Sequence, residues 1–403
     1  MGITDRHINR FYNISFFCLG IFPLLPFNIK PYALAPLVLV TIFSYVTKSH
    51  PIKSSKKVAV SASLFFVFLL STFNSSDMSR SIELIWRISP LLFMPLSMAL
   101  VPKESYIRYQ KLFSHIFIYS CAIFCVMMFT YASTLKSTNL PLIYSFIRDK
   151  FWGYEDHPIY ISLYIGIALI LLLTKKENHL LSKGLFIVLI SALVFLSRKG
   201  NIIGLLILLA GAIFWEQRKL LNKRNTQYLV VFILIAVGSA FLFENQTIDR
   251  FKELLFVNGF NLNDQTSTGI RGILWQTCIE LTLQKPFFGY GLGEVQPAIN
   301  NSLIEKGFES FTNTVSYGRF QYLNAHNQFL QMILTAGYTG GIIVLIILTQ
   351  IFRYLFQLKN KEGLFIFMYI SLCFLFESLL ERQNGIIIVA LFLNLYYFKE
   401  EKA

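Results

Sequence analysis

Long apolar runs, separated by short polar segments, recur from the beginning of the chain almost to its end. A helix of roughly 15 to 25 apolar residues can cross a bilayer, and soluble domains rarely repeat such runs. Hydrophobic residues make up 55% of the 403 residues and charged residues only 14%, which excludes an ordinary soluble domain. The chain is therefore predicted to be an all-α polytopic membrane protein, with residues 1–403 forming a single integral membrane domain.

About twelve membrane-spanning helices are expected. They lie near residues 11–27, 32–47, 58–73, 84–101, 112–132, 158–174, 184–197, 200–215, 228–243, 326–352, 364–380 and 384–398. The division between the seventh and the eighth rests only on the short sequence RKG. We read the first run as a retained helix, because no small-x-small cleavage site follows it.

The distribution of Lys and Arg supports this count and gives an orientation. The N-terminus and every second loop after it are net positive, whereas the loops between them are close to neutral or acidic, except for the short turn that carries Arg198 and Lys199. Because Lys and Arg concentrate in cytoplasmic loops, both termini are predicted in the cytoplasm and the long segment 244–325 on the opposite face. The net charge of +14 thus belongs to separate short loops. We expect membrane lipids, and no nucleic acid, as partners of these loops.

The segment 244–325 is too long for a simple turn and is therefore expected to be functional. Within it, residues 270–285 place apolar Ile273, Leu274, Cys278 and Leu281 at helical spacing. Pro286 and the glycine-rich sequence FFGYGLGE mark the end of this element. An amphipathic helix on the outer face of the bundle is predicted.

Three polar residues that are distant in sequence are predicted at this same rim: Arg198, Arg271 and His326. Two guanidinium groups could clamp a diphosphate, or each could pair with an acidic neighbour or reach the lipid headgroups. His326 could be a general base, a hydrogen-bonding orienter or a structural residue. Its H-x10-G spacing places Gly337 three turns away on the same expected helix. The following glycines would permit close helix packing.

Six further residues are candidates for binding a diphosphate or a glycan: Arg87, His157, Lys199, Arg319, Arg382 and Glu377. Arg87 is costly near the end of its span unless it is paired or faces a cavity. Arg319 could extend the clamp or be an exposed loop residue. Glu377, Glu381 and Arg382 could form an ion-pair network around the site or a solvated turn.

Several kinds of site are not indicated. No HExxH, GxSxG or CxxC sequence and no paired metal-binding carboxylates occur. Gly289, Gly291 and Gly293 resemble part of a phosphate loop but lack the strand-turn-helix context of a nucleotide fold. Neither a metal nor a cofactor is expected.

Three motifs together resemble the O-antigen ligase and polymerase superfamily: RKGNIIGL, STGIRGILWQTCIE with PFFGYGLGE, and AHNQFLQMILTAGYTGG. The resemblance covers about residues 150 to 392. It implies a GT-C-like glycosyltransferase in the bacterial inner membrane, with a large periplasmic loop between helices 9 and 10. The implied donor is a glycan on undecaprenyl diphosphate, used without metal. Arg198 and Arg271 would bind the diphosphate, and His326 would activate or orient the acceptor hydroxyl.

The resemblance leaves the acceptor open. In the ligases it is a lipid A-core hydroxyl, and in the polymerases it is the end sugar of another lipid-linked repeat. Polymerases often have two substantial outer loops, whereas this chain has one long loop, 244–325, and one short loop, 133–157, which favours a ligase. Transfer to protein is a third possibility. A lipid-linked glycan transporter would need polar groups at the midplane and internal repeats, and neither is found.

Overall fold

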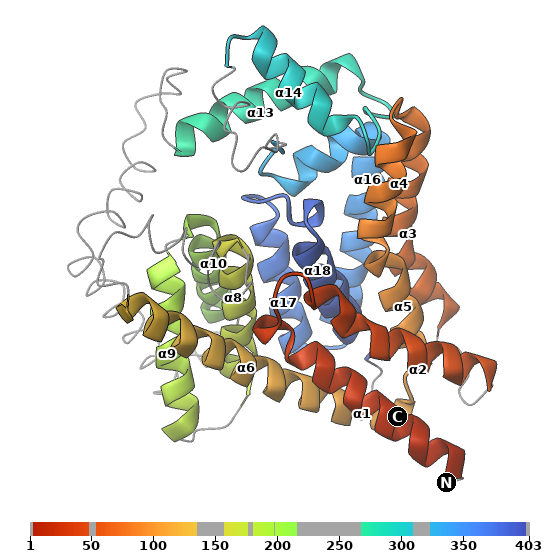
Figure 1. Ribbon diagram of the computed structural model, residues 1–403, viewed down its shortest axis with the longest axis vertical. Helices are drawn as coiled ribbons and strands as arrows, with labels where there is room; N and C mark the ends of the chain where they lie inside the picture. The colour runs from red at the N-terminus through yellow and green to blue at the C-terminus, as the bar shows by residue number, and fades with distance from the viewer. Residues whose placement is uncertain are drawn as a thin grey trace.

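The computed structural model describes residues 3–47, 54–134, 157–175, 180–196, 198–215, 267–308 and 323–399. Within these ranges every regular element is a helix, as predicted (Figure 1). The expected span at 228–243 lies outside the described residues.

The described elements follow one another in a long series of helices. The α-helices are α1 (Ile3–Gly20), α2 (Ala35–Val46), α3 (Ser55–Ser71), α4 (Met78–Ile88), α5 (Pro90–Leu100), α6 (Lys103–Thr134), α8 (Pro158–Thr174), α9 (Leu180–Leu196), α10 (Lys199–Trp215), α13 (Ser267–Gln284), α14 (Val295–Glu305), α16 (Gln328–Gln357), α17 (Lys361–Cys373) and α18 (Gln383–Tyr397). Short 3-10 helices are η1 (Phe22–Leu24), η2 (Lys30–Leu34), η3 (Thr72–Asn74) and η4 (Leu379–Glu381).

Several of these helices have the length and composition of membrane spans. Among the described residues, four helical stretches are long and apolar enough to cross a membrane: Ser55–Asn74, Met78–Leu100, Lys103–Thr134 and Gln328–Gln357. Shorter apolar helices occupy Lys30–Val46, Pro158–Thr174, Leu180–Leu196, Gly200–Leu209 and Gln383–Tyr397. The total of twelve spans stays a prediction. The run expected at 84–101 is interrupted near Pro90, where α4 ends and α5 begins.

The core is centred on α18. Every residue from Asn384 to Tyr397 is buried, so this helix is covered on all sides by its neighbours. Figure 1 shows α18 in the middle of the bundle, near α5, α16 and α17. Only η4 and Arg382 separate the turn that contains Glu377 from this buried central helix.

Helix α16 is broken at Gly337. This residue has φ 67° and ψ −176°, a conformation available essentially to glycine alone. The N–H of Tyr338, which would bond to Leu334 in an unbroken helix, donates to the Pro286 carbonyl at 2.7 Å. The Leu334 carbonyl accepts instead from the Tyr290 N–H at 2.8 Å. The expectation that His326 and Gly337 share one regular helix is therefore wrong, because His326 precedes α16 and Gly337 interrupts it.

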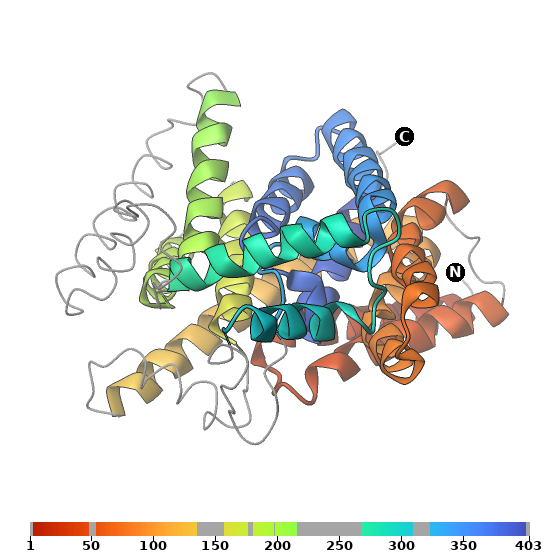
Figure 2. The ribbon, with the colours of Figure 1, turned by 90° about the horizontal axis from the view of Figure 1, so that it is seen from above.

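Helices α13 and α14 cross one end of the bundle (Figures 1 and 2). The helix expected at 270–285 is present as α13, and its four apolar residues at helical spacing are all buried. They pack in one cluster with Val295, Ile299 and Leu303 of α14 and with Leu334 of α16. Helix α14 was not predicted from the sequence. Together these contacts attach α13 firmly to the first turns of α16.

Candidate active site

His326 lies in a strained backbone conformation immediately before α16. Its φ is 45°, in the left-handed region that few non-glycine residues adopt, although histidine is among those that do. The His326 N–H donates to Asn324 Oδ1 at 2.9 Å. The next residue, Asn327, caps α16 by accepting from the Leu330 N–H at 3.1 Å. Hydrogen bonds on both sides therefore hold the histidine backbone.

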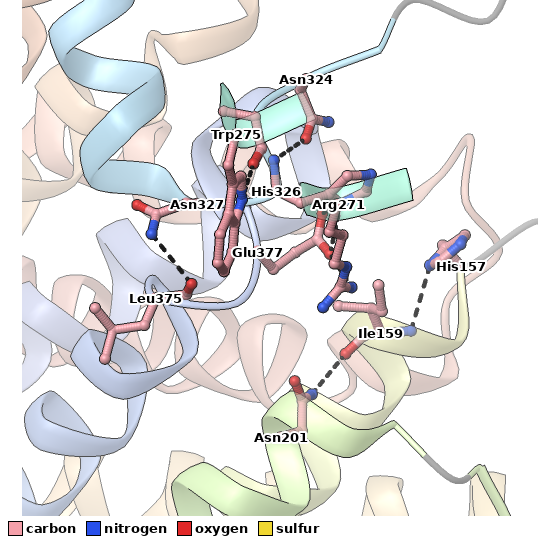
Figure 3. Close-up of polar contacts among 11 residues, drawn as sticks. His157, Ile159, Asn201, Arg271, Trp275, Asn324, His326, Asn327, Leu375 and Glu377 are labelled. Atoms are coloured by element: carbon pink, nitrogen blue, oxygen red, sulfur yellow. Dashed lines mark hydrogen bonds and ion pairs between the residues drawn. The ribbon is translucent and has the colours of Figure 1, made fainter. Parts of the chain in front are cut away.

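The His326 ring contacts a buried carboxylate. Its Nδ1 lies 3.1 Å from both Oε1 and Oε2 of Glu377, whose residue is 6% exposed (Figure 3). A carboxylate only accepts hydrogen bonds, so Nδ1 is the donor in this contact. The neutral ring then carries its lone pair on Nε2, the nitrogen that is left to act on a ligand.

Arg271 reaches the same carboxylate from α13. Its Nη2 lies 3.8 Å from Glu377 Oε2, a distance that makes an ion pair rather than a direct hydrogen bond. The Arg271 and His326 side chains are both partly exposed, whereas the carboxylate between them is buried. The arrangement thus presents a cation and a hydrogen-bonding ring outward, above a buried negative charge.

The environment keeps Glu377 ionised. Burial alone would raise the pKa of this carboxyl, but the hydrogen bond from His326 opposes it, together with electrostatic interactions with His326, Arg271 and His157. The net result is a pKa for Glu377 below its ordinary value. At neutral pH the group is therefore an anion that can support positive charge on either neighbour.

Trp275 couples α13 to the histidine backbone. It lies one helical turn after Arg271, and its indole Nε1–H donates to the Ala325 carbonyl at 2.8 Å (Figure 3). The Ala325 N–H donates in turn to Oε1 of buried Gln331 at 2.9 Å. One face of α13 therefore supplies both the cation and the clamp on the peptide before His326. The i, i+4 spacing of Arg271 and Trp275 was visible in the sequence, but nothing there indicated a shared target.

His157 joins the site from the beginning of α8. Its Nδ1 accepts from the Ile159 N–H at 3.4 Å, which caps the helix (Figure 3). Burial and the positive charges of Arg198 and Arg382 lower the pKa of His157 to about 3, so the ring is neutral at pH 7. The charges of Glu377 and His326 also act on it.

Arg198 is held on the same side by the start of α10. Asn201 Nδ2 donates to the Ile159 carbonyl at 2.9 Å, which ties α10 to α8. A Cβ at Gly200 would lie 2.6 Å from the Phe376 Cβ, so α10 also approaches the turn that contains Glu377. Half-buried Arg198 thereby occupies the region of His157, and its charge acts on that ring.

The remaining predicted site residues do not contact His326 through any interaction described above. Arg87 pairs with Glu83 on α4 at 3.1 Å, and its charge acts on Glu381. Glu381 Oε2 accepts from Gln296 Nε2 at 3.1 Å, so Glu377 and Glu381 have different partners. Arg382 is exposed at the start of α18. Arg319 and the side chain of Lys199 lie outside the described part of the structure.

The site contains few potential metal ligands. Nowhere in the described ranges do three or more His, Cys, Asp or Glu side chains form a group that could hold a metal ion.

Part of the site lies in a segment that is similar to known proteins. Residues 184–345 match the O-antigen ligase family. Over 233 residues, the chain is 27% identical to the ComP-specific O-oligosaccharyltransferase of Acinetobacter baylyi, covering 56% of this chain and 39% of that protein. The chain thus spans well under half the length of this relative. The family match contains Arg198, Arg271 and His326, whereas Glu377 lies beyond it. The match of residues 184–345 to the O-antigen ligase family agrees with the resemblance predicted from the three motifs, all of which lie within it.

Proposed function

We propose that this protein is an O-antigen ligase. It transfers polysaccharide from undecaprenyl diphosphate to a lipid A-core hydroxyl on the periplasmic face of the inner membrane. The observation that carries the proposal is the convergence of His326 and Arg271 on the buried carboxylate of Glu377. Both converging residues lie within the matched O-antigen ligase region.

In the proposed reaction His326 is the general base. Its Nε2 takes the proton of the acceptor hydroxyl as that oxygen attacks the anomeric carbon of the donor sugar. The bond from this carbon to the diphosphate oxygen breaks, and the diphosphate leaves with the electron pair. A single displacement of this kind inverts the anomeric carbon. Glu377 stabilises the imidazolium that forms and holds the ring in the productive tautomer.

The arginines act on the leaving group. Negative charge accumulates on the diphosphate as the bond breaks, and a guanidinium fork is suited to its oxygens. Arg271 comes from α13 and Arg198 precedes α10, so the two cations reach the donor from different elements. Preorganised charges of this kind supply several kcal/mol of transition-state stabilisation. Under this proposal the reaction needs neither a divalent metal nor a nucleotide.

A second candidate function is transfer to a protein hydroxyl. The similarity to the ComP-specific O-oligosaccharyltransferase favours it. The chemistry at His326 and Arg271 would be the same, and only the acceptor would differ. A repeat-unit polymerase is the third alternative, in which the acceptor is the end sugar of another lipid-linked repeat.

The test is an acceptor competition in vitro. Purified protein in liposomes receives undecaprenyl-diphosphate-linked glycan with lipid A-core, a second lipid-linked repeat or an acceptor protein, each offered separately. Ligation to lipid A-core without ATP or added metal is expected. Exclusive use of one of the other acceptors would replace the proposal with the corresponding alternative. The Arg271→Ala variant should lose activity, whereas Arg353→Ala, near the far end of α16, should retain it.

A further inference from the structure

Four large apolar side chains are exposed where the turn after α13 contacts η3 and α16. They are Phe73, Leu283, Phe287 and Phe288, with exposed fractions of 78%, 67%, 69% and 65%. We call this set the apolar rim. Side chains of this size rarely remain so exposed as a group unless another apolar phase covers them.

Backbone contacts fix the position of the rim. The Phe287 carbonyl accepts from Thr339 Oγ1 at 2.6 Å, just after the break in α16. The Phe288 carbonyl accepts from Asn74 Nδ2 at 3.1 Å, at the end of η3. The carbonyls of Phe287 and Phe288 are thus hydrogen-bonded to neighbouring helices, while the rings of both residues stay exposed.

The rim continues two exposed apolar stripes. On α3, Phe66 and Leu70 are exposed at a spacing of four residues below Phe73. On α16, Tyr338, Ile342 and Ile346 are exposed at the same spacing. Both helices belong to stretches that are long and apolar enough to cross a membrane. The rim therefore lies at the end of two surfaces of the kind that faces lipid.

The break in α16 indicates the depth of the rim. Residues 338–357 of the helix, at 1.5 Å per residue, span about 30 Å, which matches the hydrocarbon thickness of a bilayer. Gly337 thus marks the level at which α16 leaves the hydrocarbon. The hydrogen bond from Thr339 to the Phe287 carbonyl places the turn of Phe287 and Phe288 beside this level.

The exposed face of α13 carries polar Gln276 and Glu280 beside exposed Ile279, and it becomes apolar at its end. Gln276 and Glu280 are hydrogen-bonded to each other at 3.2 Å, and Glu280 also pairs with Lys306 of the loop after α14. One turn later the same face presents Leu283, and exposed Lys285 follows. A lysine beside apolar side chains is suited to the phosphate layer of a membrane.

We propose that the apolar rim inserts into the leaflet that borders this end of the bundle. The partner is bilayer lipid, with the acyl chains covering the rings and lipid phosphates meeting Lys285. The end of α13 is then anchored in the membrane, while its first half, with Arg271 and Trp275, lies in water. The contact is independent of the transfer reaction, so either proposal can fail alone.

Two measurements test the insertion. In the first, unaltered protein in nanodiscs of phosphatidylethanolamine and phosphatidylglycerol is labelled with a lipid-soluble photoactivatable diazirine and analysed by mass spectrometry. Label is expected on the peptide around Leu283–Phe288 and not at Gln276. Absence of label from the rim, with normal labelling of α3, would overturn the proposal.

The second measurement uses spin labels at Phe287→Cys and, as the matched control, Gln276→Cys. Both are made in a Cys18→Ser background, because the other four cysteines are buried. The label at 287 should collide more often with oxygen than with a water-soluble nickel chelate, and the label at 276 should show the reverse. Equal nickel access at both sites contradicts insertion. Protection of 287 from both reagents would indicate a second copy of the chain and would also contradict it.

Discussion

His326 Nδ1 and the carboxylate of Glu377 are 3.1 Å apart, although 51 residues separate them in the chain. Two elements bring them together: the turn after α17 and the strained residue before α16. Because the carboxylate is buried and anionic, this contact fixes which ring nitrogen faces a ligand. It connects the proposed base to the central helix of the fold.

The first prediction concerns this carboxylate. Glu377→Gln keeps the shape and a hydrogen-bond acceptor but removes the charge that stabilises the imidazolium. The turnover number should fall on the order of 100-fold or more, with little change in KM for the lipid-linked donor. Steady-state kinetics at matched protein levels measure the split. A variant with unchanged turnover would show that Glu377 is only structural, and Glu377→Asp should restore part of the rate.

The second prediction follows from Trp275. Trp275→Phe retains an aromatic ring but loses the donor to the Ala325 carbonyl. We expect roughly a tenfold loss of turnover, because the peptide before His326 is no longer held. The matched control is Trp86→Phe on α4, where the side chain is exposed. Equal activity of both variants would show that the hydrogen bond from Trp275 to the Ala325 carbonyl does not contribute to turnover.

The third prediction concerns pH. The pKa of His157 is lowered to about 3 in the fold and is about 6.5 in an unfolded chain, so between these values the unfolded state binds more protons. Folding stability should therefore fall as the pH is lowered through 6.5 toward 3. His157→Asn keeps a helix cap without a titrating ring. Its melting temperature should fall less than that of the parent between pH 7.5 and 4.5; parallel curves would contradict the assignment.

The fourth prediction concerns the break in α16. In Gly337→Ala the new Cβ would lie 2.1 Å from the Phe287 carbonyl oxygen, at a φ that alanine rarely adopts. We expect a destabilisation of about 2 kcal/mol or more and a lower yield of folded protein. Gly184→Ala in α9 is the control, since no atom lies within 4 Å of its Cβ position. Its thermal stability should be unchanged or higher.

The sequence predicted local structure well where one helix determined the pattern. The apolar run at 158–174 coincides with α8, and the spacing of Ile273, Leu274, Cys278 and Leu281 identified the buried face of α13. Helix α14 carried a comparable signal, since Val295, Ile299 and Leu303 recur every four residues. It was overlooked because the glycine-rich turn before it indicated a loop.

The partners within the site were less predictable, because they depend on packing between distant segments. Glu377 was identified as a candidate, yet only the burial of α18 and the turn after α17 place it against His326. Arg87 was predicted as a site residue because its charge lies near the end of an apolar run, but it pairs locally with Glu83. The break in α16 at Gly337 could not be predicted from the sequence either, because it depends on the close approach of the turn at Phe287.

In the proposed reaction His326 is the base of glycan transfer. The most direct measurement is the single-turnover rate of transfer from undecaprenyl-diphosphate-linked glycan to lipid A-core by purified His326→Ala protein. The comparison is His115→Ala on α6, where the ring bonds to the Lys111 carbonyl of its own helix. We expect His326→Ala to bind the donor and to transfer on the order of 1,000-fold more slowly, while His115→Ala keeps the parental rate. Transfer by His326→Ala at the parental rate would contradict this role of His326.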